Sequence, residues 1–98
     1  MAFEIRFTLE ALEDLRSFRK RERSQIVDEI ESQLTHQPSE ETRNRKRLRP
    51  NQLAEWELRI DKYRVFYDVE LNENQIRIAA VGRKRGSKLI IRGEEYQL

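Results

Sequence analysis

The sequence predicts a small α+β fold in which a mostly antiparallel sheet of about four to five strands is backed by an N-terminal helical hairpin. Three observations predict it. The 98 residues suffice for one modest core, apolar residues recur at helical spacing in the first third, and they alternate with polar residues in the second half. The order strand, helix, helix, strand, strand, strand favours an α+β fold. We therefore expect one domain over residues 1–98.

The first expected element is a short strand over residues 3–7, because FEIRF alternates apolar and polar residues. Thr8 follows as a helix N-cap, and the acidic residues just after it suit the positive end of a helix dipole. Leucines at helical spacing extend this first helix to about residue 19. The chain therefore begins with a half-buried strand that leads directly into a helix.

The basic segment RKRER, residues 19–23, is expected to form a turn between two helices. The second helix carries apolar residues at i, i+1, i+4 and i+8, starting from Ile26. It should end near Thr35–Gln37, because Pro38 cannot continue a helix. The two helices then form a hairpin that covers one side of the sheet.

A long connection over residues 38–52 follows, and long connections in small domains often carry function. Three further strands are expected, at about 54–60, 63–70 and 75–81, since apolar residues alternate there and turn-type residues separate them. The tail, residues 82–98, begins with RKRG and then has a short apolar run. No repeat and no second domain is visible.

The stretch WELRIDKYRVFYDV predicts a β-hairpin with a two-residue turn at Asp61-Lys62. In that register Arg59 lies opposite Arg64, although like charges directly opposite each other destabilise a sheet. One face of the hairpin is apolar and should pack on the helices. Two interpretations of the other face stay open. It is either an exposed face whose arginines are neutralised by nearby carboxylates, or an anion site in which two guanidiniums clamp a phosphate.

The charge of the chain is uneven along its length. Residues 1–42 hold 6 Lys/Arg and 10 Asp/Glu, a net charge of −4, whereas residues 43–98 hold 14 and 8, a net charge of +6. Two basic segments stand out, RNRKRLR in the long connection and RKRG after the last predicted strand. Each is either an ordinary solvated surface or a site that binds phosphate backbones without reading sequence. The candidate phosphate-binding residues are Arg43, Arg45, Lys46, Arg47, Arg49, Arg83, Arg85 and Lys88.

Several chemistries can be excluded from the sequence. The chain has no cysteine, so disulfides and thiolate nucleophiles are absent, and His36 is the only histidine. We expect no metal site and no small-molecule cofactor, because there is neither a zinc-ligand cluster nor a Gly-rich phosphate loop. Apolar runs are too short to span a bilayer, so a cytoplasmic protein is expected. Phosphodiester cleavage by an RNA 2′-hydroxyl remains possible, because cationic side chains supply much of what it needs.

Three segments together resemble the RelE/ParE superfamily of bacterial toxins from type II toxin–antitoxin systems: TRNRKRLRP (42–50), WELRIDKYRVFYDVE (56–70) and AVGRKRG (80–86). The resemblance covers nearly the whole chain. It implies the family fold, a small sheet backed by a helical hairpin. The RelE branch cleaves mRNA in the ribosomal A site by 2′-hydroxyl attack, and the ParE branch inhibits DNA gyrase. In both branches a cognate antitoxin wraps the toxin and covers its basic surface.

The resemblance also implies roles for individual residues. Arg59 matches a basic position in the strand before the turn of the ribonucleases. Arg64 matches the arginine that stabilises the transition-state phosphate. Arg83 and Lys84 fall on the basic pair that follows VG and contacts phosphate. The resemblance therefore implies that Arg59, Arg64 and Lys84 are catalytic residues.

Two positions depart from the pattern of the ribonuclease branch. Glu57 stands where some members have the lysine proposed as general base, so it becomes the candidate proton acceptor and the fourth candidate catalytic residue. Ile90 stands where many members have a tyrosine that stacks on the base, and Tyr96 lies six residues later. The phosphate-binding half of the family site is thus present, and the proton-transfer half is altered.

We therefore predict a RelE-like toxin, a ribosome-dependent mRNA endonuclease that inhibits translation and is neutralised by a cognate antitoxin. Its partners would be the antitoxin, the ribosome and mRNA, with no membrane. Two alternatives remain. One is a ParE-like inhibitor of DNA gyrase. The other is a non-catalytic protein of the same fold that binds RNA or an antitoxin.

Overall fold

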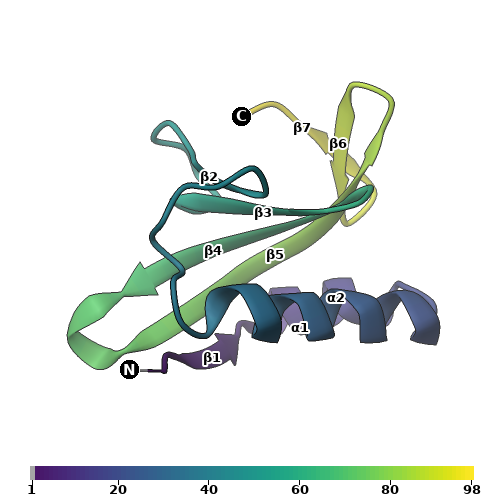
Figure 1. The fold of residues 1–98 in the computed structure, drawn as a ribbon. Helices are drawn as coiled ribbons and strands as arrows, with labels where there is room; N and C mark the ends of the chain where they lie inside the picture. Colours follow the sequence, from purple (N-terminus) through teal and green to yellow (C-terminus); the bar gives the residue numbers. More distant parts are fainter. Residues whose placement is uncertain (1) are drawn as a thin grey trace.

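The computed structural model describes residues 2–98 and packs two helices against one face of a seven-stranded sheet (Figure 1). The strands follow the order β2-β3-β4-β5-β6-β7 with antiparallel neighbours, and β1 adds to β5 in parallel. This confirms the predicted α+β class, with more strands than the four to five expected. The elements are β1 (Glu4–Phe7), α1 (Leu9–Arg16), α2 (Lys20–Leu34), β2 (Arg45–Arg47), β3 (Trp56–Ile60), β4 (Tyr63–Glu70), a 3-10 turn (Leu71–Glu73), β5 (Gln75–Arg85), β6 (Lys88–Ile91) and β7 (Glu94–Tyr96).

The helical hairpin begins as predicted but turns earlier. The Thr8 side chain accepts a hydrogen bond from Ala11 N at 3.1 Å, which caps α1, and α1 ends at Arg16 rather than near residue 19. The prediction of a turn over residues 19–23 is wrong, because α2 already begins at Lys20. Glu22 stabilises this early start by accepting a hydrogen bond from the backbone N–H of Arg19 at 3.0 Å.

The predicted register of the central hairpin is confirmed. Ile60 pairs with Tyr63 around a two-residue turn, and Arg59 lies directly opposite Arg64. Asp61 takes φ +54° at the turn, a left-handed conformation that aspartate tolerates better than most residues. The two arginines therefore share one face of the sheet.

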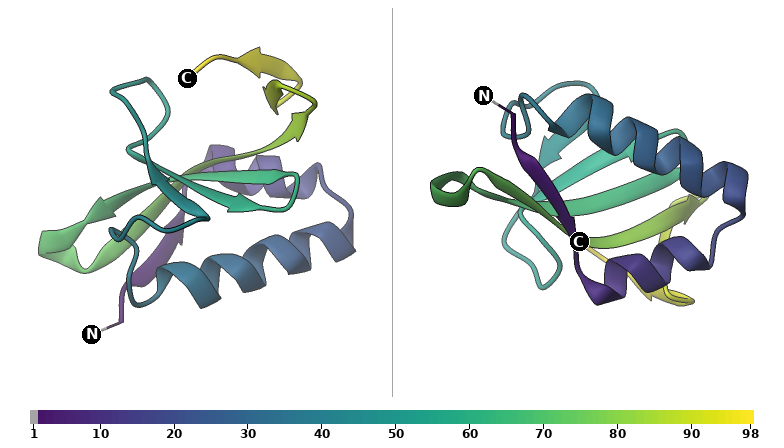
Figure 2. Two further views of the ribbon diagram at one scale, coloured as in Figure 1. Left: turned by 45° about the horizontal axis from the view of Figure 1, so that its top comes forward. Right: turned by 90° about the horizontal axis from the view of Figure 1, so that it is seen from below.

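The main core lies between the sheet and the two helices, which run across one face of the sheet (Figure 2). Fully buried side chains from α2 meet the apolar face of the hairpin predicted from the sequence. Burial of this continuous apolar surface is the dominant favourable term in folding. The buried members of this cluster are Ala11, Leu15, Phe18, Ile26, Ile30, Leu34, Trp56, Leu58, Ile60, Tyr63, Val65, Tyr67, Ile76, Ile78 and Val81.

A β-bulge in β5 changes which face its residues occupy. Phe66 of β4 pairs with Ala80, but Tyr67 pairs with Ile78, so Ala79 is an extra residue. Ile78 and Val81 consequently both join the helix-side core although they are three residues apart. Strict alternation would have placed them on opposite faces.

The tail forms two strands that the sequence analysis did not predict. β5 runs on to Arg85, and β6 and β7 form a hairpin, residues 88–96, that rises over the second face of the sheet (Figure 1). Its turn holds Arg92 at φ +53° and Gly93 at φ +77°. A second, smaller apolar cluster lies beneath it, formed by Ala54, Phe66, Ala80, Leu89 and Ile91.

The second face of the sheet is therefore not simply exposed. Phe66 is fully buried and Glu57 is only 7% exposed, because the tail and the 48–54 segment cover part of this face. Within residues 2–98, no helix is both long and apolar enough to cross a membrane.

Candidate functional site

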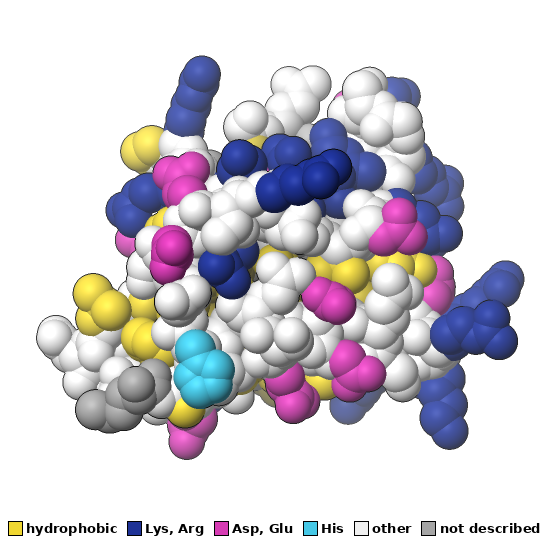
Figure 3. Space-filling model, viewed as in Figure 1, with side chains coloured by type: hydrophobic (Ala, Val, Ile, Leu, Met, Phe, Trp, Pro, Cys, Tyr) yellow, Lys and Arg dark blue, Asp and Glu magenta, His cyan; other side chains and the backbone are white. Residues whose placement is uncertain are grey.

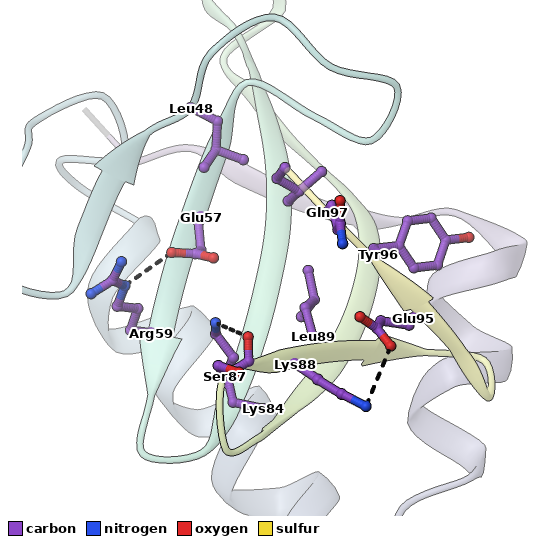
Figure 4. Close-up of a pocket in the computed structure, with 11 residues that line it drawn as sticks. Leu48, Glu57, Arg59, Lys84, Ser87, Lys88, Leu89, Glu95, Tyr96 and Gln97 are labelled. Carbon is purple, nitrogen blue, oxygen red and sulfur yellow. Dashed lines mark hydrogen bonds and ion pairs between the residues drawn. The ribbon is translucent and has the colours of Figure 1, made fainter.

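A cleft of about 490 Å³ opens on the second face, between β3 and the β6–β7 hairpin (Figure 4). Strands from distant parts of the chain supply its walls, so only the folded sheet brings them together. The cleft is lined by Leu48, Glu57, Arg59, Lys84, Ser87, Lys88, Leu89, Glu95, Tyr96, Gln97 and Leu98. Three of the four candidate catalytic residues and one candidate phosphate-binding residue, Lys88, thus meet in one cavity.

Glu57 and Arg59 form an ion pair within β3. Arg59 Nε donates to Glu57 Oε1 at 2.9 Å, and the Arg59 side chain is 48% exposed while that of Glu57 is 9% exposed. Both side chains come from the same face because they lie two residues apart on a strand. This pair agrees with the first interpretation for one of the two arginines, because Glu57 neutralises Arg59.

Arg64 lies beside this pair but does not line the cleft. Its Nη1 donates to the carbonyl oxygens of Asp61 at 2.7 Å and Tyr63 at 2.8 Å, so the guanidinium folds back onto the turn. Its Nε is buried without a hydrogen-bond partner among residues 2–98. Burial lowers the pKa of the Arg64 guanidinium, and the Arg59 charge lowers it further against the opposing effect of Glu57. A nearby anion would offset both costs.

The basic pair after the VG dipeptide is divided between the two faces. Lys84 lines the cleft and its Nζ donates to the carbonyl oxygen of Ser87 at 3.4 Å. Lys88 also lines the cleft, with its Nζ 3.9 Å from Glu95 (Figure 4). Arg85 is exposed at the end of β5, outside the cleft.

Arg83 points to the helix side. Its guanidinium lies 4.8 Å from the centre of the Phe18 ring, and its Nη2 lies 3.9 Å from Glu22. Tyr63 donates to the same carboxylate at 2.6 Å, and this bond lowers the pKa of Glu22. Ile90 pairs with Arg83 and shares its side, away from the cleft. The sequence predicted that Arg83 would contact phosphate together with Lys84. The alternation of β5 instead places Arg83 on the helix side, opposite to the cleft.

Arg45 is a structural residue rather than a surface cation. It is 8% exposed, and its guanidinium donates to the carbonyl oxygens of Gln33 at 2.7 Å and Glu40 at 3.0 Å. These contacts fasten the long connection to the end of α2. Arg45 was predicted to bind phosphate, but its guanidinium is buried and already donates to two backbone carbonyl oxygens.

The other basic residues of the long connection lie at the surface along the sheet edge. β2 is a short edge strand, so the basic segment is not a free loop. Lys46 pairs with Glu57 and so lies on the cleft side, whereas Arg47 stacks 5.7 Å above the Trp56 ring. Arg43 and Arg49 are exposed. Figure 3 shows Lys and Arg side chains gathered along the upper side of the molecule, where β2 and β3 lie, and at its right-hand end.

The contribution of β7 to the cleft was not predicted from the sequence. Glu95 and Tyr96 reach it because the β6–β7 hairpin folds back over the sheet. Figure 4 shows Tyr96 at the rim, with its ring directed away from Glu57. Gly93 was the available signal, because a two-residue hairpin turn requires left-handed residues and glycine adopts that conformation readily.

The site is a mixed-charge cleft suited to an anion. Lys84 and Lys88 face it from two strands, and Arg59 is half exposed at its edge. Cationic side chains on rigid strands bind phosphate with little loss of conformational freedom. Residues 2–98 contain no group of three or more His, Asp or Glu side chains placed to hold a metal ion.

Solved structures show the same fold. The chain is similar to a chain of the toxin–antitoxin complex RelBE2 from Mycobacterium tuberculosis, with 24% identity, a TM-score of 0.75, and coverage of 86% of this chain and 93% of that one. It is also similar to a chain of the archaeal RelE–RelB complex from Pyrococcus horikoshii OT3, at 19% identity and a TM-score of 0.62 over 89% and 99% of the two chains. A chain of the intact E. coli RelBE complex matches at 18% identity and a TM-score of 0.54, over 87% and 100%.

No curated protein sequence matches the chain. The sequence profile of the family described as "ParE toxin of type II toxin-antitoxin system, parDE" matches residues 5–87. That match runs from β1 through the end of β5 and includes both helices, the long connection and the central hairpin. The chain therefore belongs to the ParE toxin family of type II toxin–antitoxin systems, within the RelE/ParE superfamily.

Proposed function

We propose that this toxin is a ribosome-dependent mRNA endonuclease that is held inactive by a cognate antitoxin. The observation that carries the proposal is the cleft in which Lys84, Lys88 and the Glu57–Arg59 pair meet. RNA presents one phosphate per nucleotide, and Arg59, Lys84 and Lys88 in this mixed-charge cleft can neutralise that charge. Arg64 lies next to the cleft, opposite Arg59, where a bound phosphate would offset the repulsion between the two arginines.

The reaction that fits the cleft is attack of a 2′-hydroxyl on the adjacent phosphate. The O2′–P bond forms, the P–O5′ bond breaks, and a cyclic phosphate and a free 5′-hydroxyl result. Glu57 takes the proton of the 2′-hydroxyl, and Lys84 donates a proton to the leaving O5′. Arg59 and Arg64 stabilise the additional negative charge that develops on the phosphate. When the phosphate draws Arg59 away, Glu57 becomes free to accept the proton.

An antitoxin is the second partner in the proposal. Two of the similar structures reported above are toxin–antitoxin complexes, and the third is a RelE–RelB complex. An extended acidic segment would place carboxylates where the phosphates of mRNA bind, near Lys84 and Lys88. Such a segment would inhibit by occupying the cleft, and its binding would weaken with salt because charge pairing drives it.

Inhibition of DNA gyrase is the second candidate, and the description of the matching family favours it. In that case the toxin binds a protein, and the cleft cations act in docking. The non-catalytic alternative is supported by the ion pair that already engages Glu57. The three functions predict different outcomes of induced expression: cut mRNA, intact mRNA with a DNA-damage response, or neither.

The test is primer extension on mRNA after induced expression of the wild type, Lys84→Ala, Arg64→Ala and Arg77→Ala. The wild type should arrest growth and cut translated mRNA, and Lys84→Ala and Arg64→Ala should relieve both effects. Arg77→Ala is the matched control, because it removes an exposed cation at the opposite end of β5, which carries Lys84, and should leave activity unchanged. Growth arrest with intact mRNA and a DNA-damage response would instead support gyrase inhibition.

A further inference from the structure

Asp14 is a buried carboxylate that the proposed reaction does not use. It lies on α1 and is 2% exposed. Its Oδ2 accepts a hydrogen bond from Val81 N at 3.0 Å, and Arg92 Nη1 lies 3.2 Å from the same atom. A buried carboxylate costs stability unless it is paired and hydrogen-bonded, and these two contacts provide that compensation.

The position of Val81 explains why a helix supplies its hydrogen-bond acceptor. Along one edge of β5, the pairing with β1 ends at Ile78, opposite Phe7, and the pairing with β6 starts only at Arg83, opposite Ile90. Val81 lies in the gap between those two strands, so neither of them reaches its N–H. The Asp14 side chain reaches into this gap from α1 and accepts the hydrogen bond of Val81 N. The carboxylate is therefore fixed by the backbone of the central strand.

Arg92 links this fixed carboxylate to the β6–β7 hairpin. It occupies the turn between the two strands, and its side chain reaches back to α1 with 33% of its surface exposed. The hairpin is also attached to β5 by three register pairs, Arg83–Ile90, Lys84–Leu89 and Arg85–Lys88, and by Leu89 and Ile91, which are buried in the second apolar cluster. The same hairpin supplies Lys88, Leu89 and Glu95 to the cleft.

We propose that Asp14 and Arg92 are positioning residues that hold the β6–β7 hairpin in place as one wall of the cleft. Neither side chain lines the cleft, so both act through the backbone of the hairpin. When the ion pair is lost, the hairpin opens more often and Lys88 moves away from Lys84 and Arg59. The positioning role stands on geometry alone, and only its consequence for RNA binding rests on the proposed function.

Hydrogen exchange tests the positioning role directly. Arg92→Gln removes the charge at similar length, and Asp14→Asn keeps an oxygen for Val81 N. Each variant should speed amide exchange in residues 88–96 by about tenfold or more, because hydrogen bonds to charged groups hold local structure closed. Exchange in α2 and β3 should not change. Arg92→Lys should restore part of the protection.

The matched control is Arg77→Gln, which breaks an arginine–aspartate pair with Asp68 at the other end of β5 and should leave exchange in residues 88–96 unchanged. Unchanged exchange in residues 88–96 in both Arg92→Gln and Asp14→Asn would overturn the proposal. A uniform rise across the whole chain would also overturn it, because that result indicates a general loss of stability.

A second measurement separates this inference from the proposed function. A single-stranded RNA oligonucleotide should bind Arg92→Gln more weakly than Arg77→Gln, since only the former displaces Lys88. If the hairpin exchanges faster but induced expression of the wild type leaves mRNA intact, the positioning role stands and the proposed function fails. If RNA binds equally to both variants while hairpin exchange is unchanged, the positioning role fails and the proposed function stands.

Discussion

The two faces of the sheet each hold an ion pair between a buried carboxylate and an arginine, but the pairs differ in what surrounds them. On the helix side, the Asp14 side chain is 1% exposed and also binds a backbone N–H. On the cleft side, the Glu57 side chain is 9% exposed and its partner Arg59 is half exposed. The first pair joins three elements, whereas the second lies within one strand and faces an open cleft.

A buried carboxylate therefore does not by itself mark a functional site. Asp14 is the more buried of the two, yet both of its contacts, with Val81 N and Arg92, are structural. Glu57 is held by a single side chain that an incoming anion can compete for. The charged side chains of Asp14 and Arg92 on the helix side are thus held in one arrangement. Those of Glu57 and Arg59 beneath the hairpin can rearrange when an anion binds. Three predictions test how far this contrast extends.

The largest expected effect concerns the two apolar clusters. Leu58→Ala removes a fully buried side chain from the helix-side core and should cost about 2–5 kcal/mol of unfolding free energy. Leu89→Ala should cost clearly less, because Leu89 borders the cleft and its loss leaves no closed cavity. Urea unfolding of both variants measures the difference, with exposed Leu71→Ala as the control. Equal costs would mean that both faces are packed alike.

A smaller effect is expected where β5 meets β6. A Cβ atom added at Gly82 would lie 2.5 Å from the carbonyl oxygen of Ile90 and 2.6 Å from Ile91 Cγ1. Gly82→Ala should therefore force the strands apart and cost about 1–3 kcal/mol. Gly86→Ala is the comparison, because its added Cβ meets nothing within 4 Å and only its φ of +61° is strained. Thermal unfolding and hydrogen exchange of residues 88–96 would show whether the cleft wall loosens in Gly82→Ala alone.

The smallest effect is a pH dependence with opposite signs for two carboxylates on the helix side. Burial raises the pKa of Asp14 above 3.8, so its contribution to stability is present below pH 3.8 and is lost as pH rises through the native pKa. The hydrogen bond from Tyr63 lowers the pKa of Glu22 below 4.5, so its contribution is present above pH 4.5 and is lost as pH falls through the native pKa. In urea unfolding between pH 3 and 7, the unfolding free energy of wild type should therefore fall relative to that of Asp14→Asn as pH rises. The unfolding free energy of wild type should fall relative to that of Glu22→Gln as pH falls. If the two differences in unfolding free energy changed with pH in the same direction, this assignment would be wrong.

The central hairpin could be predicted from the sequence alone. Alternation with period two in WELRIDKYRVFYDV predicted the pairing of Ile60 with Tyr63 and the opposition of Arg59 and Arg64, and both are confirmed. It could do so because the information is local: a two-residue turn and an apolar face leave one register that buries the face. The helical spacing of apolar residues likewise predicted the hairpin of helices, and Pro38 predicted where α2 ends.

The surroundings of that hairpin depend on contacts between segments that are distant in the sequence. The bulge at Ala79 placed Val81 and Arg83 on the helix side and left Lys84 on the cleft side. The tail folded back so that Lys88 and Glu95 closed a cleft over Glu57. Each of these outcomes depends on partners far away in the sequence, and pattern within one segment carries no information about such partners. The sequence therefore specifies which strands carry charge, and long-range packing specifies which of those charges meet.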